Sequence, residues 1–235
     1  MDTKETNNRT RSLIRRRFAQ IFIQFAVIGL ILFITAGTVS WISAWLYLAA
    51  GLAIMLLALP VLLRKNPEVI AERAQVKKDT KQFDRIFNFY STVITLAMLV
   101  CAGLDYRYGW STGIPLSLRI IGLVFYISGM GLFYWALISN KFFSTTVRIQ
   151  TESGHFVVRE GPYRYVRHPG YSGMILATIG VPLLLGSYWT LIPALMVVTG
   201  YLVRTLLEDR TLKEELSGYN EFCTLVPDRI IPGVW

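Results

Sequence analysis

The stretch "VSWISAWLYLAAGLAIMLLALPVLL" at residues 39–63 contains no charged side chain. A helix needs about 20 apolar residues to cross the roughly 30 Å hydrocarbon core of a membrane. Three more uncharged runs of similar length lie at 18–37, 86–104 and 120–139. A composition of 53% hydrophobic and 17% charged residues agrees with a chain that is partly dissolved in lipid. We therefore predict four membrane-spanning helices.

Two shorter apolar runs, 171–186 and 187–203, follow nearer the C-terminus, and each contains an internal proline, Pro182 or Pro193. Proline inside a membrane helix is tolerated where neighbouring groups satisfy the freed carbonyl, so we expect kinks there. These runs predict a tilted or shallow helical hairpin over 171–203. The predicted fold is an all-α, multi-pass transmembrane helical bundle of four spanning helices plus this C-terminal hairpin.

The net charge of +9 could indicate a nucleic-acid partner, so its distribution matters. Every basic residue except Arg107 and Arg119 lies in the N-terminal segment, in 64–85, in 140–170 or in the C-terminal tail. This is the pattern of the positive-inside rule, and it predicts that those segments and both termini are cytoplasmic. A chain with six membrane crossings and a chain with four crossings plus a hairpin would both satisfy this rule. We expect no nucleic-acid partner.

The chain divides by composition into three regions: a basic N-terminal segment at 1–17, the transmembrane helices with a cytoplasmic loop (64–85) at 18–139, and a polar-rich region with the hairpin and tail at 140–235. The basic start also resembles a secretory signal, but no small-residue cleavage site follows it. In 64–85, Asn66 and Pro67 fit the cap and first turn of a solvated interfacial helix. Cys101 and Cys223 are expected to be unpaired and inert.

Residues 160–173 read "EGPYRYVRHPGYSG", which is unusually polar for this chain. Pro169 suits the first turn of a helix, so we expect the N–H groups of 170–172 to be unsatisfied and to face the preceding loop. Beside His168, such a helix start predicts a seat for an anionic group such as a carboxylate. Interfacial anchoring would explain the tyrosines equally well, and ordinary polar contacts would explain His155 and His168. Two histidines without cysteine or acidic partners do not predict a metal site.

Arg204 and Glu208 follow the last apolar run and share one helix face, because they are four residues apart. Ionisable groups at this depth are costly unless they are paired or functional. Two interpretations remain: an ion pair that stabilises the helix, or a clamp in which Arg204 holds a carboxylate and Glu208 holds a donor or a cation.

The sequence resembles the isoprenylcysteine carboxyl methyltransferase family of integral membrane enzymes, which is related to phospholipid N-methyltransferases. The resemblance rests on "GHFVVREGPYRYVRHPGYSG" (154–173), on Arg204 followed by "EDRTL", and on "GYNEF" (218–222) with "RIIPGVW" (229–235). "NPEVIAERA" (66–74) and "GLDYRYGWS" (103–111) are similar to the bacterial branch.

The resemblance implies a methyltransferase that uses S-adenosylmethionine in a cytoplasm-facing pocket, with a lipophilic or lipidated acceptor that enters from the bilayer. Arg204 matches the family's substrate-orienting arginine. By the same resemblance, the cofactor-binding residues would be Gln150, His155, Phe156, Val157, Val158, Tyr163, His168, Pro169, Gly170, Tyr171 and Glu208. A carboxylate acceptor is already ionised at neutral pH and needs a cation to aim it, whereas an amine would need a base.

The tail departs from the family pattern, with Asp209 in place of a second glutamate, Phe222 in place of a tyrosine, and Leu225, Pro227 and Asp228 in place of basic or aromatic residues. These differences bear on the identity of the acceptor. Two alternatives are a membrane sterol or steroid reductase using NADPH, whose signature departs at Gly170 and Met174, and a non-catalytic membrane scaffold.

Overall fold

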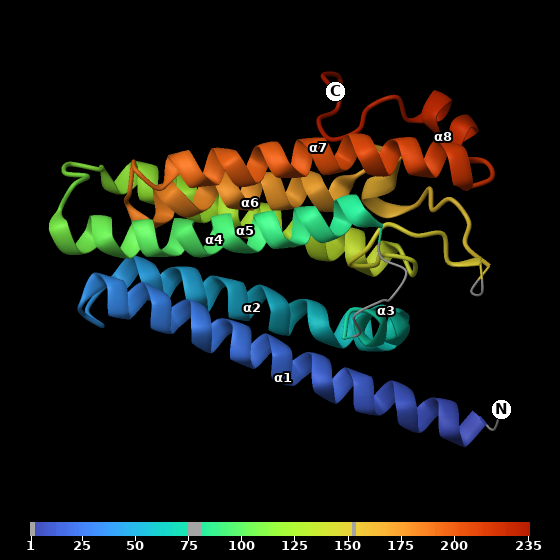
Figure 1. Ribbon diagram of the computed structural model, residues 1–235, viewed down its shortest axis with the longest axis horizontal. Coiled ribbons are helices and arrows are strands. Elements are labelled where there is room, and N and C mark those ends of the chain that lie inside the picture. The colour runs from blue at the N-terminus through green and yellow to red at the C-terminus, as the bar shows by residue number, and fades with distance from the viewer. Residues whose placement is uncertain (1–2, 75–80, 152–153) are drawn as a thin grey trace.

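The computed structural model describes residues 3–74, 81–151 and 154–235, which form helices joined by loops (Figure 1). In chain order the helices are α1 (Thr3–Ala36), α2 (Ile42–Lys65), α3 (Pro67–Glu72), α4 (Gln82–Tyr108), α5 (Leu116–Ser139), the 3-10 helix η2 (Gly161–Arg164), α6 (Pro169–Leu185), α7 (Leu191–Glu215) and α8 (Tyr219–Leu225). The described residues contain no strand, as the all-α prediction requires.

Among the described residues, five helices are long and apolar enough to cross a membrane: Arg11–Ala36 of α1, and α2, α4, α5 and α7. The first four contain the four predicted spans to within three residues at the ends of the predicted runs 18–37 and 39–63. The fifth, α7, was expected to be one arm of a shallow hairpin ending at 203, but it continues through charged sequence to Glu215. Its 25 residues extend about 37 Å at 1.5 Å per residue, which exceeds the membrane core. α6, with 17 residues, is the shorter arm.

The two prolines of this hairpin lie near helix ends, so they have less effect on helix direction than the predicted kinks would have. Pro182 lies inside α6, close to the C-terminal end of that helix at Leu185. Pro193 is in the first turn of α7, where the backbone N–H of a helix has no partner within the helix anyway. Pro193 therefore begins a helix rather than kinking one.

α5 and α6 pack at unusually close range because glycines face each other across their interface. A Cβ on Gly129 of α5 would lie 2.4 Å from the backbone nitrogen of Ala177, and one on Gly173 of α6 would lie 2.5 Å from the carbonyl oxygen of Gly129. Gly122 and Gly180 make a second such contact seven residues farther along. Small residues let membrane helices approach backbone to backbone, so these glycines fix the position at which α6 begins.

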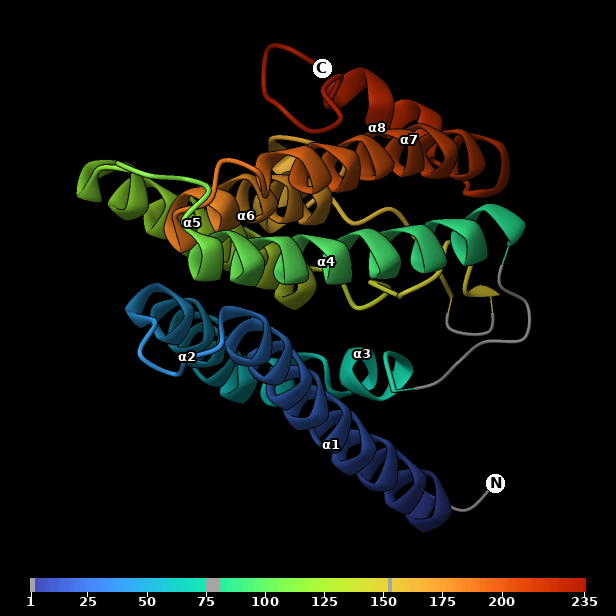
Figure 2. The ribbon, with the colours of Figure 1, turned by 60° about the vertical axis from the view of Figure 1, so that its left-hand side comes forward.

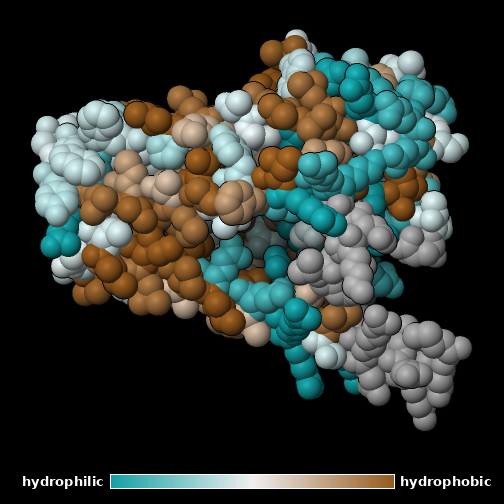
Figure 3. Space-filling model, viewed as in Figure 1, coloured by the Kyte–Doolittle hydropathy of each residue, from teal (hydrophilic) through white to brown (hydrophobic). Residues whose placement is uncertain are grey.

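The two ends of the bundle differ in chemistry. Both termini, α3 and α8 lie at one end (Figures 1 and 2), which also carries the loop 140–168 and most of the basic residues. The opposite end carries Arg107, Arg119 and a set of exposed aromatic side chains, namely Tyr106, Tyr108, Trp110, Tyr188 and Trp189. Tyrosine and tryptophan favour the membrane–water interface. In Figure 3, hydrophobic surface covers much of the helical body and hydrophilic surface gathers at the basic end.

The predicted helix start in 64–85 is confirmed, with Asn66 at the N-cap position of α3 and Pro67 in its first turn, but the prediction that this helix is solvated is wrong. α3 has only six residues, and Val69 and Ile70 are buried against Leu62 of α2 and Leu137 of α5. Asn66 does not cap α3 with its side chain but donates to the carbonyl of Ile138 at 2.7 Å. Residues 75–80 of the loop lie outside the described residues. The described part of the loop that includes α3 therefore packs into the basic end of the bundle.

Candidate functional site

A cavity of about 290 Å³ lies at the basic end of the bundle. Its walls come from Arg73, which directly follows α3, and from α4, α5, the loop 140–168, α6, α7 and α8. Apolar rings and charged groups share these walls, so the cavity suits a ligand with both kinds of surface. Residues far apart in the chain meet there, and helix packing rather than local sequence creates the site.

One wall of the cavity is the loop that connects α5 to α6. Gly161 adopts a left-handed conformation with φ of 58°. A Cβ there would also lie 2.2 Å from Oγ of Ser139, so this position requires glycine. The turn places Tyr163 in the wall, where its hydroxyl accepts a hydrogen bond from the amide of Asn140 at 3.2 Å. Burial raises the pKa of Tyr163 well above its usual range, and the phenol therefore stays neutral at physiological pH.

The same loop carries an aromatic cluster at the cavity. The ring of His155 stacks on Phe142, with ring centroids 4.3 Å apart, and Phe156 meets Phe142 edge to face at 5.1 Å. Gln150 is buried and donates from its side chain to the carbonyl of Phe142 at 2.7 Å, while its backbone N–H donates to Nδ1 of His155. Gln150 therefore supports the cluster without lining the cavity itself.

The beginning of α6 differs from the prediction. The N–H groups of Tyr171 and Ser172 are not free, because both donate to the carbonyl of His168, at 3.0 and 3.1 Å. The backbone amides of residues 170–172 were expected to face a ligand. Of these three, only the amide of Gly170 makes no bond to the His168 carbonyl, and Gly170 lies in the cavity wall. A Cβ on Gly170 would come within 2.6 Å of the Phe143 ring, so glycine keeps this corner of the cavity open. Pro169 is buried at the first position of the helix and does not line the cavity.

Glu208 brings a carboxylate to the cavity from α7. It accepts a short hydrogen bond from the hydroxyl of Tyr171, and its Oε1 lies 4.0 Å from Nδ1 of His168. The Glu208 side chain is 23% exposed, so part of the carboxylate faces the open space of the cavity. The expected helix ion pair is not formed: Arg204 and Glu208, both described residues, point to different partners. The carboxylate therefore keeps capacity for a further donor or a cation.

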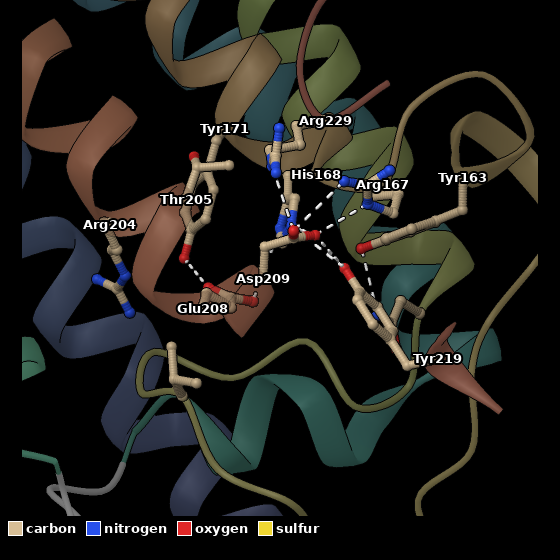
Figure 4. Close-up of polar contacts among 12 residues, drawn as sticks. Tyr163, Arg167, His168, Tyr171, Arg204, Thr205, Glu208, Asp209, Tyr219 and Arg229 are labelled. Carbon is tan, nitrogen blue, oxygen red and sulfur yellow. Dashed lines mark hydrogen bonds and ion pairs between the residues drawn. The ribbon is translucent and has the colours of Figure 1, made fainter. Parts of the chain in front are cut away.

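Asp209, the next residue, is the centre of a buried polar network (Figure 4). Its Oδ1 accepts from Nε of Arg167 at 2.9 Å and from the hydroxyl of Tyr219 at 3.0 Å, and lies 3.4 Å from Nε2 of His168. Lys213 and Arg229 approach Oδ2 at 3.1 and 3.2 Å. A buried carboxylate needs such partners to offset its lost hydration. The network ties α7 to the 160–173 segment, to α8 and to the tail.

Arg167 connects this network to residues 226–230. Its Nη1 donates to the carbonyls of Val226 and Pro227, and its backbone N–H donates to the carbonyl of Asp228 at 3.0 Å. The next backbone N–H, that of His168, donates to the carbonyl of Arg229 at 2.9 Å. Burial would lower the pKa of the Arg167 guanidinium, but its hydrogen bond to Asp209 and the charge of that carboxylate, with smaller contributions from Cys223 and Tyr219, together outweigh burial and raise the pKa. These hydrogen bonds thus hold residues 226–229 of the tail against the segment where α6 begins.

Arg204 lies in the cavity wall, with its guanidinium held from the opposite helix. Nη2 lies 2.9 Å from Oδ1 of Asp84 on α4 and donates to the carbonyl of Thr145 at 2.9 Å. Nη1 donates to Asn88 at 3.4 Å, and the Phe87 ring lies 4.5 Å from Cζ. Both Arg204 and Asp84 are buried. The Arg204 charge is therefore partly offset within the protein.

The structure brings together most of the residues that the sequence pointed to. The cavity is lined by Arg204, His155, Phe156, Val157, Val158, Tyr163, His168, Gly170, Tyr171 and Glu208. Gln150 and Pro169 lie behind its wall. The charged lining directly after α3 (Arg73) and the contacts of Asp84, Arg167 and Asp209 were missed. Only Arg167 had a local signal, since it is a basic residue inside the motif 160–173; Asp84 is one acid in a mixed-charge loop.

No group of three or more histidine, cysteine or acidic side chains in the described ranges has a metal-binding arrangement. Cys101 and Cys223 are both free thiols. The chemistry available at the site is therefore the recognition of an organic ligand by rings, a carboxylate, a histidine and guanidinium groups.

Comparisons with known proteins agree on one family. The profile of the Isoprenylcysteine carboxyl methyltransferase (ICMT) family matches residues 121–217. The chain is 30% identical over 126 residues to "Protein-S-isoprenylcysteine O-methyltransferase B" of Arabidopsis thaliana, covering 53% of this chain and 61% of the relative. It is 35% identical over 66 residues to a "Probable protein-S-isoprenylcysteine O-methyltransferase" of Oryza sativa subsp. indica, covering 28% of this chain and 35% of the relative.

A third relative is the "Uncharacterized protein YpbQ" of Bacillus subtilis (strain 168), 34% identical over 82 residues, which are 34% of this chain and 48% of that protein. The chain thus matches between about a third and three fifths of the length of these relatives. The profile match runs from α5 to the end of α7 and includes the loop over the cavity, the start of α6 and Glu208. Through this stretch, which builds most of the cavity wall, the chain is similar to the isoprenylcysteine carboxyl methyltransferase family.

Proposed function

We propose that the protein is an integral membrane methyltransferase that transfers a methyl group from S-adenosylmethionine to a lipid-like acceptor, a carboxylate of the isoprenylcysteine type. The observation that carries this proposal is the cavity itself. Ten of the twelve side chains that the family resemblance implicates line it together, although they come from the loop 140–168, α6 and α7. The names of the plant relatives give the same acceptor class.

The residues of the cavity fit S-adenosylmethionine. The carboxylate of Glu208 is an acceptor for amine or hydroxyl donors and a counter-charge for a cation, and it remains partly exposed toward the open space. The rings of Phe142 and Tyr171 offer flat apolar surface for a base, and Gly170 keeps backbone within reach of the ligand. A volume of about 290 Å³ favours an adenosyl compound over the larger NADPH.

When bound, S-adenosylmethionine supplies a methyl group on a positively charged sulfur, which is electrophilic without further activation. An ionised acceptor carboxylate forms the new C–O bond as the C–S bond breaks, and the products are a methyl ester and S-adenosylhomocysteine. No proton moves in this step. The protein's task is to orient the two partners and exclude water, and the fastened tail over the start of α6 serves that purpose.

The proposed orientation in the membrane places the basic end, with both termini and the cavity, in the cytoplasm. Its support is the charge asymmetry of the loops together with the exposed aromatic side chains at the other end. Methyl transfer would then take place at the cytoplasmic surface of the bilayer, where a soluble cofactor and a lipid-anchored acceptor can both reach the site.

Isothermal calorimetry on the detergent-purified protein tests the proposal, with S-adenosylhomocysteine and NADPH as titrants. We expect saturable binding of the adenosyl compound and none of NADPH. Binding of NADPH alone would identify a reductase instead. If neither compound binds to protein that elutes as a single folded species, the scaffold alternative replaces the methyltransferase.

A further inference from the structure

Arg73 lies in a wall shared by two cavities. It lines the cavity of the candidate site, and it also lines a second cavity of about 70 Å³ between α1, α2, α3 and α5. The second cavity is bounded mainly by aliphatic and aromatic side chains, including Met55, Leu59, Leu62, Ile70 and Leu137. A guanidinium at this boundary can reach a polar group of a ligand in the first cavity, while an apolar segment attached to that polar group lies in the second cavity.

The guanidinium of Arg73 has aromatic neighbours but no acidic partner. Its Cζ lies 5.6 Å from the centroid of the Phe133 ring and 5.5 Å from that of Phe143. Among the described residues, no carboxylate forms an ion pair with Arg73. Burial, followed by the repulsion of Arg17, lowers the pKa of Arg73 to about 10. The group is still protonated at neutral pH, and its charge is uncompensated.

Arg17 of α1 adds a second positive charge to the same place. It lines the second cavity beside Arg73, and its Nη1 donates to the side chain of Gln20 at a long 3.5 Å. No acidic side chain in the described ranges forms an ion pair with it either. Two unpaired guanidinium groups beside apolar walls are costly unless an anion joins them.

The contrast with Arg204 identifies the cation that is available to a ligand. Both terminal nitrogens of Arg204 have partners in Asp84, the carbonyl of Thr145 and Asn88, and only its buried Nε lacks one among the described residues. Arg73 lines the same cavity with its donors uncommitted. An acidic ligand group therefore finds its strongest unshared partner in Arg73, directly after α3, rather than on α7.

We propose that Arg73, assisted by Arg17, binds the acid group of the methyl acceptor and makes the enzyme specific for anionic amphiphiles, with the apolar segment next to that acid lying in the second cavity. This inference rests on the proposed function and assigns its acceptor site. The acid group is a carboxylate, because it must also receive the methyl group from the cofactor in the adjoining cavity. In this arrangement Arg204 shapes the wall and Arg73 aims the acceptor.

The test compares Arg73→Gln with Arg64→Gln, an exposed arginine at the end of α2 that faces neither cavity. Two probes are titrated by calorimetry: an N-acetylated, S-prenylated cysteine with a free carboxylate, and its neutral carboxamide. We expect Arg73→Gln to weaken binding of the acid by about tenfold or more, as for a lost charge-assisted hydrogen bond, and to leave the carboxamide unchanged. Arg73→Lys should retain part of the preference for the acid, and Arg64→Gln all of it.

Binding of S-adenosylhomocysteine, measured on the same preparations, reports folding and tests the proposed function separately. Loss of that binding in the wild type would refute the methyltransferase, whereas retained binding with equal affinity for acid and carboxamide would refute only the role of Arg73. A wild-type preference for the acid that survives in Arg73→Gln would also overturn the inference. So would a single-chain phosphate lipid that binds through Arg73 where the carboxylate does not, since the site would then hold a membrane lipid.

Discussion

Asp84 on α4 and Arg204 on α7, 120 positions apart in the chain, form a buried ion pair in which Oδ1 and Nη2 are 2.9 Å apart. Asp84 is fully buried, and its second oxygen accepts the backbone N–H of Val147 at 2.6 Å. One carboxylate thus joins two helices and the loop 140–168 around the cavity. Its partners make a buried charge tolerable, so each member of the pair depends on the other.

Replacement of Asp84 by alanine should lower the free energy of unfolding by about 3 to 5 kcal/mol, because it leaves the Arg204 guanidinium buried and unpaired. Thermal unfolding of the detergent-purified protein measures this loss. The matched control is Glu221→Ala, which breaks the exposed pair between Glu221 and Arg159 and should cost at most about 1 kcal/mol. Equal effects of the two substitutions would show that the Asp84–Arg204 pair is not a stabilising contact.

Glu208→Ala should weaken binding of S-adenosylhomocysteine by roughly tenfold or more, since a cavity carboxylate that accepts donors would be lost. Calorimetry on the purified protein provides the affinity. Glu214→Ala is the control, because Glu214 lies on the same helix with 67% of its side chain exposed. An unchanged affinity in Glu208→Ala would remove Glu208 from the cofactor site.

Asp209→Asn should loosen the tail, because neutralising the carboxylate weakens its contacts with Arg167, Lys213 and Arg229 together. We expect trypsin to cleave after Arg229 several times faster than in the wild type, since cleavage requires local release of the backbone. Mass spectrometry of a digestion time course gives the rate. Glu214→Gln serves as the control on α7, and an identical cleavage rate in Asp209→Asn would contradict a fastening role for Asp209.

Gly129→Ala should destabilise the bundle by about 1 to 3 kcal/mol, because its Cβ would overlap the backbone of α6 at Ala177. Gly131, two residues along α5, has open space where a Cβ would lie. Gly131→Ala should be neutral or slightly stabilising, since alanine favours helix over glycine by up to about 1 kcal/mol. Thermal unfolding of both variants measures the change in stability. A loss of stability in Gly131→Ala as large as in Gly129→Ala would show that close packing at Gly129 is not the cause of the destabilisation.

The helices could be predicted from the sequence because the length of an uncharged run directly limits which segments can cross a membrane. The extent of α7 could not, since its charged half is held by partners from elsewhere: Arg204 by Asp84 on α4, and Asp209 by Arg167 and the tail. α3 was misjudged for a related reason. Its mixed charges indicated a solvated surface, but Val69 and Ile70 pack against α2 and α5.

The candidate site shows the same contrast between features that local sequence predicts and contacts that only helix packing creates. The family resemblance carried by the motif 160–173 implied Tyr163, His168, Gly170 and Tyr171 as site residues, and all four line the cavity. Their bonding partners were not predictable: Tyr171 donates to Glu208, and His168 meets Asp209 and Tyr219. Arg73 belongs to a segment that the sequence placed outside the site, and only helix packing brings it to the cavity.

The bonds from Arg167 and His168 to residues 226–229 also bear on the order in which the parts of the site come together during synthesis. The helices from α1 to α6 can enter the membrane while α7 and α8 are still being made, but the residues that cover the start of α6 are translated about sixty positions after it. A nascent chain therefore inserts with this region uncovered. Under the proposed function, the site would be completed only once residues 226–229 have been translated and have docked against the start of α6.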